Sequence, residues 1–104
     1  MASGEIPVPY LFKSDTVFAI KDINPQAPTH ALIIPVAHHE NAALLAEGNP
    51  EALSELFRVA KAIADGVGLD GYRTVFNTGA SAGQSVFHAH LHLLGGRPFA
   101  WPPG

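Results

Sequence analysis

The sequence has 104 residues, of which 47% are hydrophobic and 14% charged, a composition that excludes an intrinsically disordered chain. Six lysines and arginines against nine aspartates and glutamates give a net charge of −3, the wrong sign for a nonspecific binder of nucleic acids or anionic membranes. The absence of cysteine excludes disulfides, thiol catalysis and cysteine-based zinc fingers.

One soluble, cytoplasmic domain over residues 1–104 is the expected organisation. No apolar stretch approaches the ~18 residues that a membrane span requires. The start of the chain lacks a basic segment followed by an apolar one, so we expect no signal peptide.

Short strands and a proline-rich loop are predicted for the first third of the chain. The prolines within 6–9 favour an extended or turn-like start. Apolar runs predict strands at 10–12 and 16–20, separated by a polar break. After the loop 22–28, the apolar run 30–35 is closed by proline and is typical of a buried strand.

The clearest helical signal follows in the middle of the chain. Asn49 is a suitable N-cap, Pro50 suits the first helical position, and Gly68 is suited to end the helix. Apolar residues recur at three- and four-residue spacing and form one stripe: Leu53, Leu56, Phe57, Ala60, Ile63, Ala64 and Val67. A shorter helix is expected at 39–47, without a recognisable cap.

The last third predicts two more strands. Residues 72–76 and 86–94 have strand patterns, with a small-residue loop at 77–85 between them and an irregular tail at 95–104. Strands at both ends of the chain therefore flank a central pair of helices. This order favours an α+β meander, with an antiparallel sheet of about five strands and two helices on one face.

Six histidines fall into two groups, His30, His38 and His39 in the first and His88, His90 and His92 in the second. Alternation along the last predicted strand would place the second group on one face, about 7 Å apart in steps of two residues. The opposite face would pack on the helix and would consist of Phe87, Ala89, Leu91 and Leu93.

Three interpretations of this histidine row remain open. They can be ordinary surface residues, or zinc ligands, although no carboxylate lies near them in sequence to support a metal. Imidazole is also a nucleophile near neutral pH. The loop 77–85 favours the third interpretation, because its small residues let an anionic substrate approach the backbone, although it lacks a Walker A ending.

The segment 88–94, His-Ala-His-Leu-His-Leu-Leu, resembles the signature of the histidine triad (HIT) superfamily, His-φ-His-φ-His-φ-φ with φ apolar, at every position. Further segments are similar to its Hint branch, the histidine triad nucleotide-binding proteins: 22–30, Asn77, 83–85, 94–97 and 101–104. The resemblance extends from about Ile6 to Gly104. It implies one HIT domain, a HIT-like fold and a homodimer.

The resemblance implies a purine nucleoside phosphoramidase, which splits the P–N bond of adenosine or guanosine 5′-monophosphoramidates through a nucleotidyl-histidine. His90 would be the nucleophile, while Ser85 and His92 would contact the phosphate and the leaving group. The backbone of His88 would orient the His90 ring. The resemblance implies neither a metal nor another cofactor.

A nucleotide-binding set also follows from the resemblance: Asp22, Ile23, Asn77, Gly83, Gln84, Ser85, His90 and His92. Asp22 would accept hydrogen bonds from the ribose hydroxyls, although capping of its own turn is equally expected. Asn77 and the backbone amides of 83–85 would hold phosphate oxygens. His30 and His38 would support the site rather than react.

Two alternatives stay open. A dinucleoside polyphosphate hydrolase of the same superfamily shares the triad but not the C-terminal Trp-Pro-Pro-Gly, and a nucleotide- or zinc-binding regulatory protein could use the pocket without turnover. The loop 78–82 lacks acidic residues found in some members, and Pro9 replaces a lysine found in others, which leaves substrate preference open.

The tail suggests how the chain assembles. Phe99 and Trp101 are large apolar residues on an irregular end, and such groups tend to become interfaces. Hint-like proteins are homodimers whose C-terminal segments approach the partner's active site. We therefore expect a twofold dimer with Trp101 near the partner's site, and no nucleic-acid or membrane partner.

Overall fold

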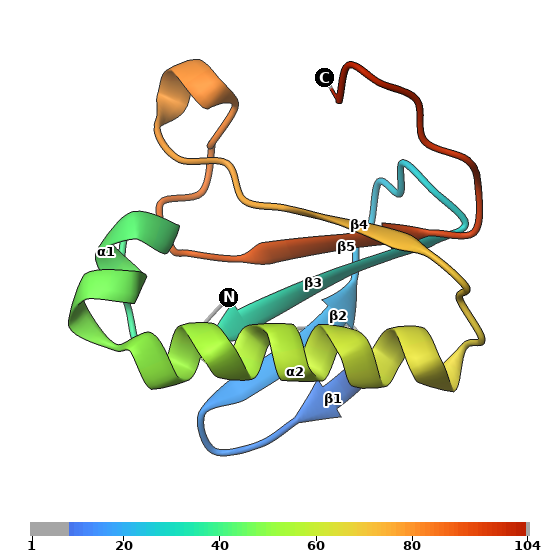
Figure 1. The fold of residues 1–104 in the computed structure, drawn as a ribbon. Coiled ribbons are helices and arrows are strands. Elements are labelled where there is room, and N and C mark those ends of the chain that lie inside the picture. Colours follow the sequence, from blue (N-terminus) through green and yellow to red (C-terminus); the bar gives the residue numbers. More distant parts are fainter. Residues whose placement is uncertain (1–8, 104) are drawn as a thin grey trace.

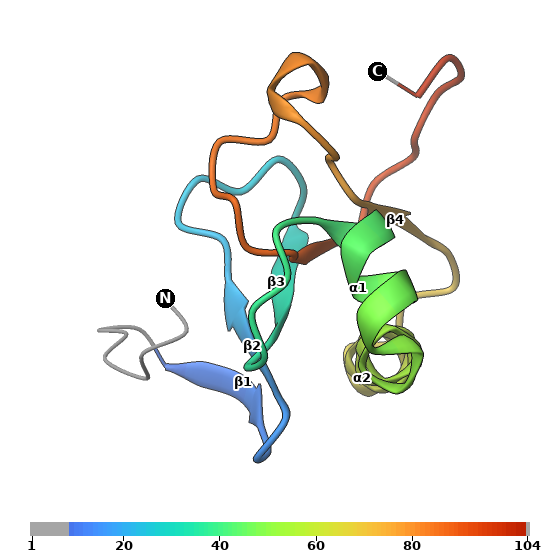
Figure 2. The same cartoon turned by 90° about the vertical axis from the view of Figure 1, so that its left-hand side faces the viewer.

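The computed structural model describes residues 9–103, with a sheet and two α-helices that share one face of it (Figures 1 and 2). The elements within this range are β1 (Tyr10–Lys13), β2 (Val17–Lys21), β3 (Thr29–Pro35), α1 (Ala42–Gly48), α2 (Pro50–Gly66), β4 (Tyr72–Val75), a 3₁₀ turn η1 (Ala80–Ala82) and β5 (Leu91–Gly95). No described helix is long and apolar enough to cross a membrane.

The five strands lie in the order β1-β2-β3-β5-β4, and every neighbouring pair is antiparallel. The chain therefore enters at one edge, and β5 inserts between β3 and β4 (Figure 1). This arrangement confirms the predicted α+β fold. It also places β3 and β5 side by side, with Leu32 opposite His92.

Helix α2 begins and ends where the sequence predicts. The Asn49 side chain accepts a hydrogen bond from the amide of Ala52 at 3.2 Å, which stabilises the first turn by about 1 kcal/mol. After the helix, Gly68 adopts a positive φ of 75° that other residues rarely tolerate. Leu56, Ala60 and Ala64 are buried against the sheet. Two outer members of the predicted stripe, Phe57 and Val67, are exposed instead.

Helix α1 has a cap that the sequence reading missed. It begins at Ala42 rather than at residue 39, and the Asn41 side chain accepts from the amide of Leu44 at 3.0 Å. Leu45 is its buried residue and packs in the same core as Leu56. The segment before the cap is not helical, and through the carbonyls of His39 and Glu40 it contacts residues 84–90, called here the histidine loop.

The prediction of a strand over 86–94 is wrong in its first half, because β5 begins only at Leu91. The pairing of β4 with β5 ends at Val75 and His92, so residues 86–90 have no strand beside them on that side. His88 and His90 therefore do not lie on a strand face with His92. Phe87, predicted to face the core, is exposed. The other three members of that predicted face are buried as expected: Ala89, Leu91 and Leu93.

The tail after β5 is irregular through residue 103, as predicted. Phe99 lies between two arginines, with Arg73 5.0 Å and Arg97 4.4 Å from its ring centre. The extended start predicted for 6–9 lies outside the described residues except for Pro9, and Gly104 also lies outside them.

Candidate active site

The histidines gather where β3, β5 and the loop before β5 meet. His30 lies on β3, His92 on β5, and His90 immediately before β5. Two hydrogen-bonded histidine pairs are present, His30 with His92 and His38 with His88. His90 contacts both, through a hydrogen bond to the backbone of His88 and a ring contact with His92.

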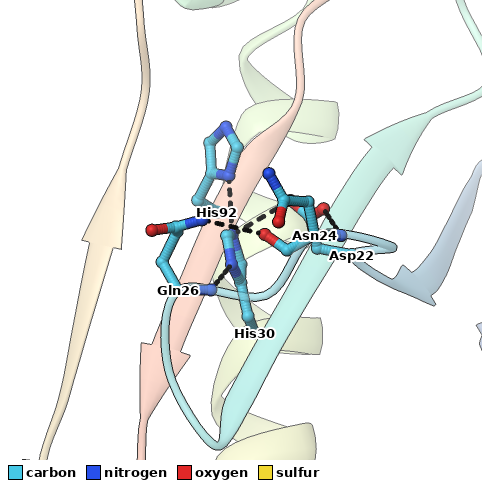
Figure 3. A network of polar contacts seen from close by, with 5 residues as sticks. All are labelled: Asp22, Asn24, Gln26, His30 and His92. Carbon is cyan, nitrogen blue, oxygen red and sulfur yellow. Dashed lines mark hydrogen bonds and ion pairs between the residues drawn. The ribbon is translucent and has the colours of Figure 1, made fainter.

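Figure 3 shows the polar contacts of the first pair, from which its proton positions follow. The backbone N–H of Gln26 donates to His30 Nδ1 at 3.0 Å, so a neutral His30 must carry its own proton on Nε2. His30 Nε2–H donates to His92 Nδ1 at 3.0 Å, and the Asp22 carboxylate lies 3.3 Å from the same His30 nitrogen. His92 Nδ1 therefore accepts, and the His92 proton lies on Nε2.

Burial lowers the pKa of His92 below its usual value, and the neighbouring charges of His90 and His30 add to this effect. The Asp22 carboxylate opposes the shift. Burial likewise lowers the pKa of His88, against the effect of its hydrogen bond to the Pro35 carbonyl. Both residues are therefore neutral near pH 7.

These lowered pKa values predict a loss of stability in mild acid. Between the lowered pKa of folded His92 and the ordinary value of about 6.5, the unfolded chain binds more protons, so the free energy of unfolding falls as the pH drops through this range. Urea unfolding at about pH 7.5 and about pH 5.5 measures the difference. His92→Asn keeps an acceptor for His30 but cannot titrate, and should reduce the difference. An unchanged difference in that variant would contradict the assignment.

One ring nitrogen of His90 is hydrogen-bonded to the backbone, and the other is available to react. Its Nδ1 lies 2.8 Å from the backbone oxygen of His88, which can only accept, so Nδ1 carries the proton. The lone pair of neutral His90 is consequently on Nε2. The rings of His90 and His92 are 5.0 Å apart between centres at 63°. The arrangement can supply a nucleophilic nitrogen beside an N–H donor.

The loop before β5 is organised by Gln84, which is buried. Its side-chain oxygen accepts from the amide of Gly79 at 2.8 Å, and its side-chain nitrogen donates to the carbonyls of Glu40 at 2.7 Å and Val86 at 3.1 Å. The backbone amides of Gly83 and Gln84 donate within the loop, to Ala80 and Gly79. In this structure these expected phosphate-binding groups hold the loop together.

Gln84→Ala should therefore destabilise the protein by about 1–3 kcal/mol. The substitution leaves the Gly79 amide and the Glu40 and Val86 carbonyls without their hydrogen-bond partner at a buried position. Chemical denaturation measures the loss. Ser81→Ala, at an exposed position of the same loop, is the matched control and should change stability by less than about 0.5 kcal/mol. Equal stability of the two variants would show that the Gln84 bonds do not hold the loop.

The other predicted site residues near the histidines are more exposed to solvent. Ser85 is exposed, Asn77 is half-buried at the start of the loop, and Ile23 is 88% exposed beside Asp22. Their contacts with a nucleotide stay predictions. Asp22 also caps its own turn, since its Oδ1 accepts from the amide of Asn24 at 2.8 Å while Oδ2 faces His30 (Figure 3).

Asp22, His30 and His92 form a cluster that could be considered for a metal, since each offers a ligand atom within 4.8 Å of the others. A metal would require the lone pair of His30 Nε2. The Gln26 amide instead directs the His30 lone pair to Nδ1 and leaves the proton on Nε2. The cluster therefore fits a hydrogen-bonded relay and does not fit a metal ion in this arrangement.

Two backbone groups that control the histidines were missed from the sequence, the amide of Gln26 and the carbonyl of Pro35, which lies 2.7 Å from His88 Nε2. Every residue except proline carries both groups, so no residue type signals such a role. Only the return of the loop 22–28 onto β3 places the Gln26 amide beside His30.

The HIT domain family model matches residues 3–99. A HIT-like protein from Synechocystis is 46% identical over 101 residues, covering 96% of this chain and 89% of that protein. A 14 kDa zinc-binding protein from Zea mays is 50% identical over 103 residues, covering 96% and 80%.

A crystal structure of a HIT family hydrolase from Legionella pneumophila superimposes with a TM-score of 0.93 at 46% identity, over 100% of this chain and 95% of that one. The fold, the family match over nearly the whole chain and the triad of His88, His90 and His92 agree. The chain belongs to the HIT domain family.

Proposed function

We propose that the protein binds a purine nucleotide and hydrolyses the P–N bond of nucleoside 5′-monophosphoramidates through a nucleotidyl-histidine at His90. The observation that carries this proposal is the bond from His90 Nδ1–H to the His88 carbonyl, which leaves the Nε2 lone pair free. Similarity to HIT family hydrolases supports a hydrolase.

In the first step His90 Nε2 attacks the α-phosphorus and the P–N bond to the amine breaks, with a proton from solvent accompanying the leaving amine. The attacking ring becomes a cation, and the His88 carbonyl on Nδ1–H stabilises that charge. In the second step water attacks the same phosphorus and releases a proton to solvent, the bond to Nε2 breaks, and the nucleoside monophosphate leaves. Catalysis here is positioning and charge stabilisation.

His92 would hold the phosphate of the nucleotide, and Asp22 would hold its ribose. The His92 Nε2–H is a neutral donor for a phosphate oxygen, and its tautomer is set by His30. Asp22 would accept from ribose hydroxyls, and its side chain is still partly exposed at 18%. Because His30 Nε2 contacts both residues, one nucleotide can reach from the ribose subsite to the reacting phosphate.

The proposed functional unit is a homodimer. β4 forms an edge of the sheet, and Trp101 in the tail is 81% exposed. A second copy that covers both would place its tail near the site of the first. Light scattering coupled to size exclusion should give twice the chain mass, and a monomer at micromolar concentration would contradict this part of the proposal.

The deciding experiment compares two substrates in the presence of a chelator: adenosine 5′-phosphoramidate with a fluorogenic amine, and a diadenosine polyphosphate. We expect rapid metal-independent turnover of the phosphoramidate and slow turnover of the polyphosphate. The reverse preference would favour the polyphosphate hydrolase branch. Binding of AMP by isothermal titration without turnover of either substrate would favour a regulatory nucleotide-binding protein.

A further inference from the structure

We propose that His38 is a positioning residue for the nucleophile: its donor on one nitrogen of His88, together with the Pro35 carbonyl on the other, keeps the His88 ring in one tautomer and one position and thereby holds the backbone carbonyl that orients His90. The effect on rate rests on the proposed function of His90. The effect on ring protonation does not, so the two can fail separately.

The second histidine pair has only one consistent arrangement of protons when His88 is neutral. His88 Nε2 lies 2.7 Å from the Pro35 carbonyl, which can only accept, so Nε2 carries the proton. His88 Nδ1 is then an acceptor. His38 Nδ1 lies 2.9 Å away and must donate to it, with the two ring centres 5.0 Å apart.

His88 is the residue through which the loop is attached to the end of β3. Its ring bonds to Pro35, its backbone oxygen accepts from His90 Nδ1 at 2.8 Å, and the next amide, of Ala89, donates to the carbonyl of His39 at 2.8 Å. Residues 86–90 belong to no strand. Such side-chain and loop bonds, rather than a sheet ladder, hold the carbonyl against His90.

His38 donates to His88 whether the His38 ring is neutral or protonated. His38 is exposed, and both its neutral Nδ1–H form and its cation present a proton to His88. Without that donor, His88 Nδ1 has no partner from the segment 35–39, and only the Pro35 bond holds the ring, so the other tautomer, which releases Pro35, becomes populated. The His88 carbonyl would then adopt more than one position and would no longer orient the His90 ring.

Three variants separate positioning from a general structural effect. His38→Ala removes the donor. His38→Asn places an amide N–H close to the position of Nδ1–H and should rescue. His39→Ala is the matched control, because its ring lies against Gly48 at the end of α1 rather than against the histidine loop.

Long-range ¹H–¹⁵N spectra of the histidine rings give the readout that needs no activity. In the native protein we expect His88 protonated on Nε2 and His90 on Nδ1. His38→Ala should give mixed tautomers at both residues, whereas His38→Asn and His39→Ala should keep the native pattern. Unmixed tautomers in a folded His38→Ala, or mixed tautomers in His38→Asn, would overturn the proposal.

The kinetic arm uses the phosphoramidate substrate. His38→Ala should lower kcat by roughly three- to tenfold, the effect of about one neutral hydrogen bond, and leave KM and AMP affinity within about twofold. An equal loss in His39→Ala, or a loss confined to KM, would show that His38 does not act through the nucleophile. If the protein turns over no phosphoramidate at all, the proposed function fails and the ring spectra alone decide the role of His38.

Discussion

Replacing His90 by alanine should lower phosphoramidate turnover by more than about a thousandfold, because the variant lacks the nitrogen that we propose forms the nucleotidyl intermediate. Stopped-flow fluorescence of amine release measures the rate. Intact-protein mass spectrometry after rapid acid-free quenching should show one nucleotidyl group on the native chain and none on the variant. Binding of AMP should persist, since the contacts that we propose for Asp22 and His92 are untouched.

A matched control distinguishes loss of the nucleophile from disturbance of the site. His39→Ala also removes an imidazole, one whose ring lies beside Gly48, and it should keep turnover within about threefold. An adduct that still forms in His90→Ala would place the nucleophile elsewhere in the triad. Turnover that survives without any adduct would instead indicate direct attack by water and remove the covalent step from the mechanism.

Replacing Leu91 by alanine should have the largest effect on stability, about 2–5 kcal/mol. Leu91 is fully buried at the start of β5 and belongs to the core cluster that includes Ile33 and Leu56. Leu91 stands between His90 and His92 in the sequence, so a backbone shift of β5 into the cavity would displace both histidines. Turnover should therefore also fall at temperatures where the variant is still folded.

Urea unfolding at neutral pH measures this loss, with the activity assay done well below the midpoint. Leu44→Ala is the control, because Leu44 is the same residue type but 43% exposed on α1, and it should lose less than half as much stability. Similar losses in the two variants would show that the core is not centred on β5. A stability loss with unchanged turnover would separate the packing of β5 from the site.

The two histidine pairs give the site its chemical character. Each pair ends on a backbone group, the Gln26 amide for His30 and the Pro35 carbonyl for His88, and these groups set the proton positions in both rings. His90 lies between the pairs with its lone pair on Nε2. An imidazole nitrogen beside neutral His88 and His92 is suited to attack on an anionic phosphate ester near pH 7.

Local patterns in the sequence determined the fold class and most elements. The Asn49-Pro50 start and the Gly68 end of α2 and the buried run of β3 are features of neighbouring residues, and the structure places them as predicted. The three- and four-residue spacing also predicted which face of α2 packs on the sheet, apart from its exposed outer members.

Tertiary structure alone decided how the histidines pair. Alternation predicted one row on a strand, but a strand requires a neighbour, and β4 ends at Val75 before it could pair with residues 86–90. Residues 84–90 are instead held by long-range hydrogen bonds to the segment 35–40. Gln84 bonds to Glu40, 44 residues away in sequence, and His88 bonds to Pro35, 53 residues away. Because backbone amides and carbonyls are the same in every residue, their contacts with imidazoles have no signature in the sequence. Which nitrogen of each histidine carries its proton is therefore a property of the folded chain.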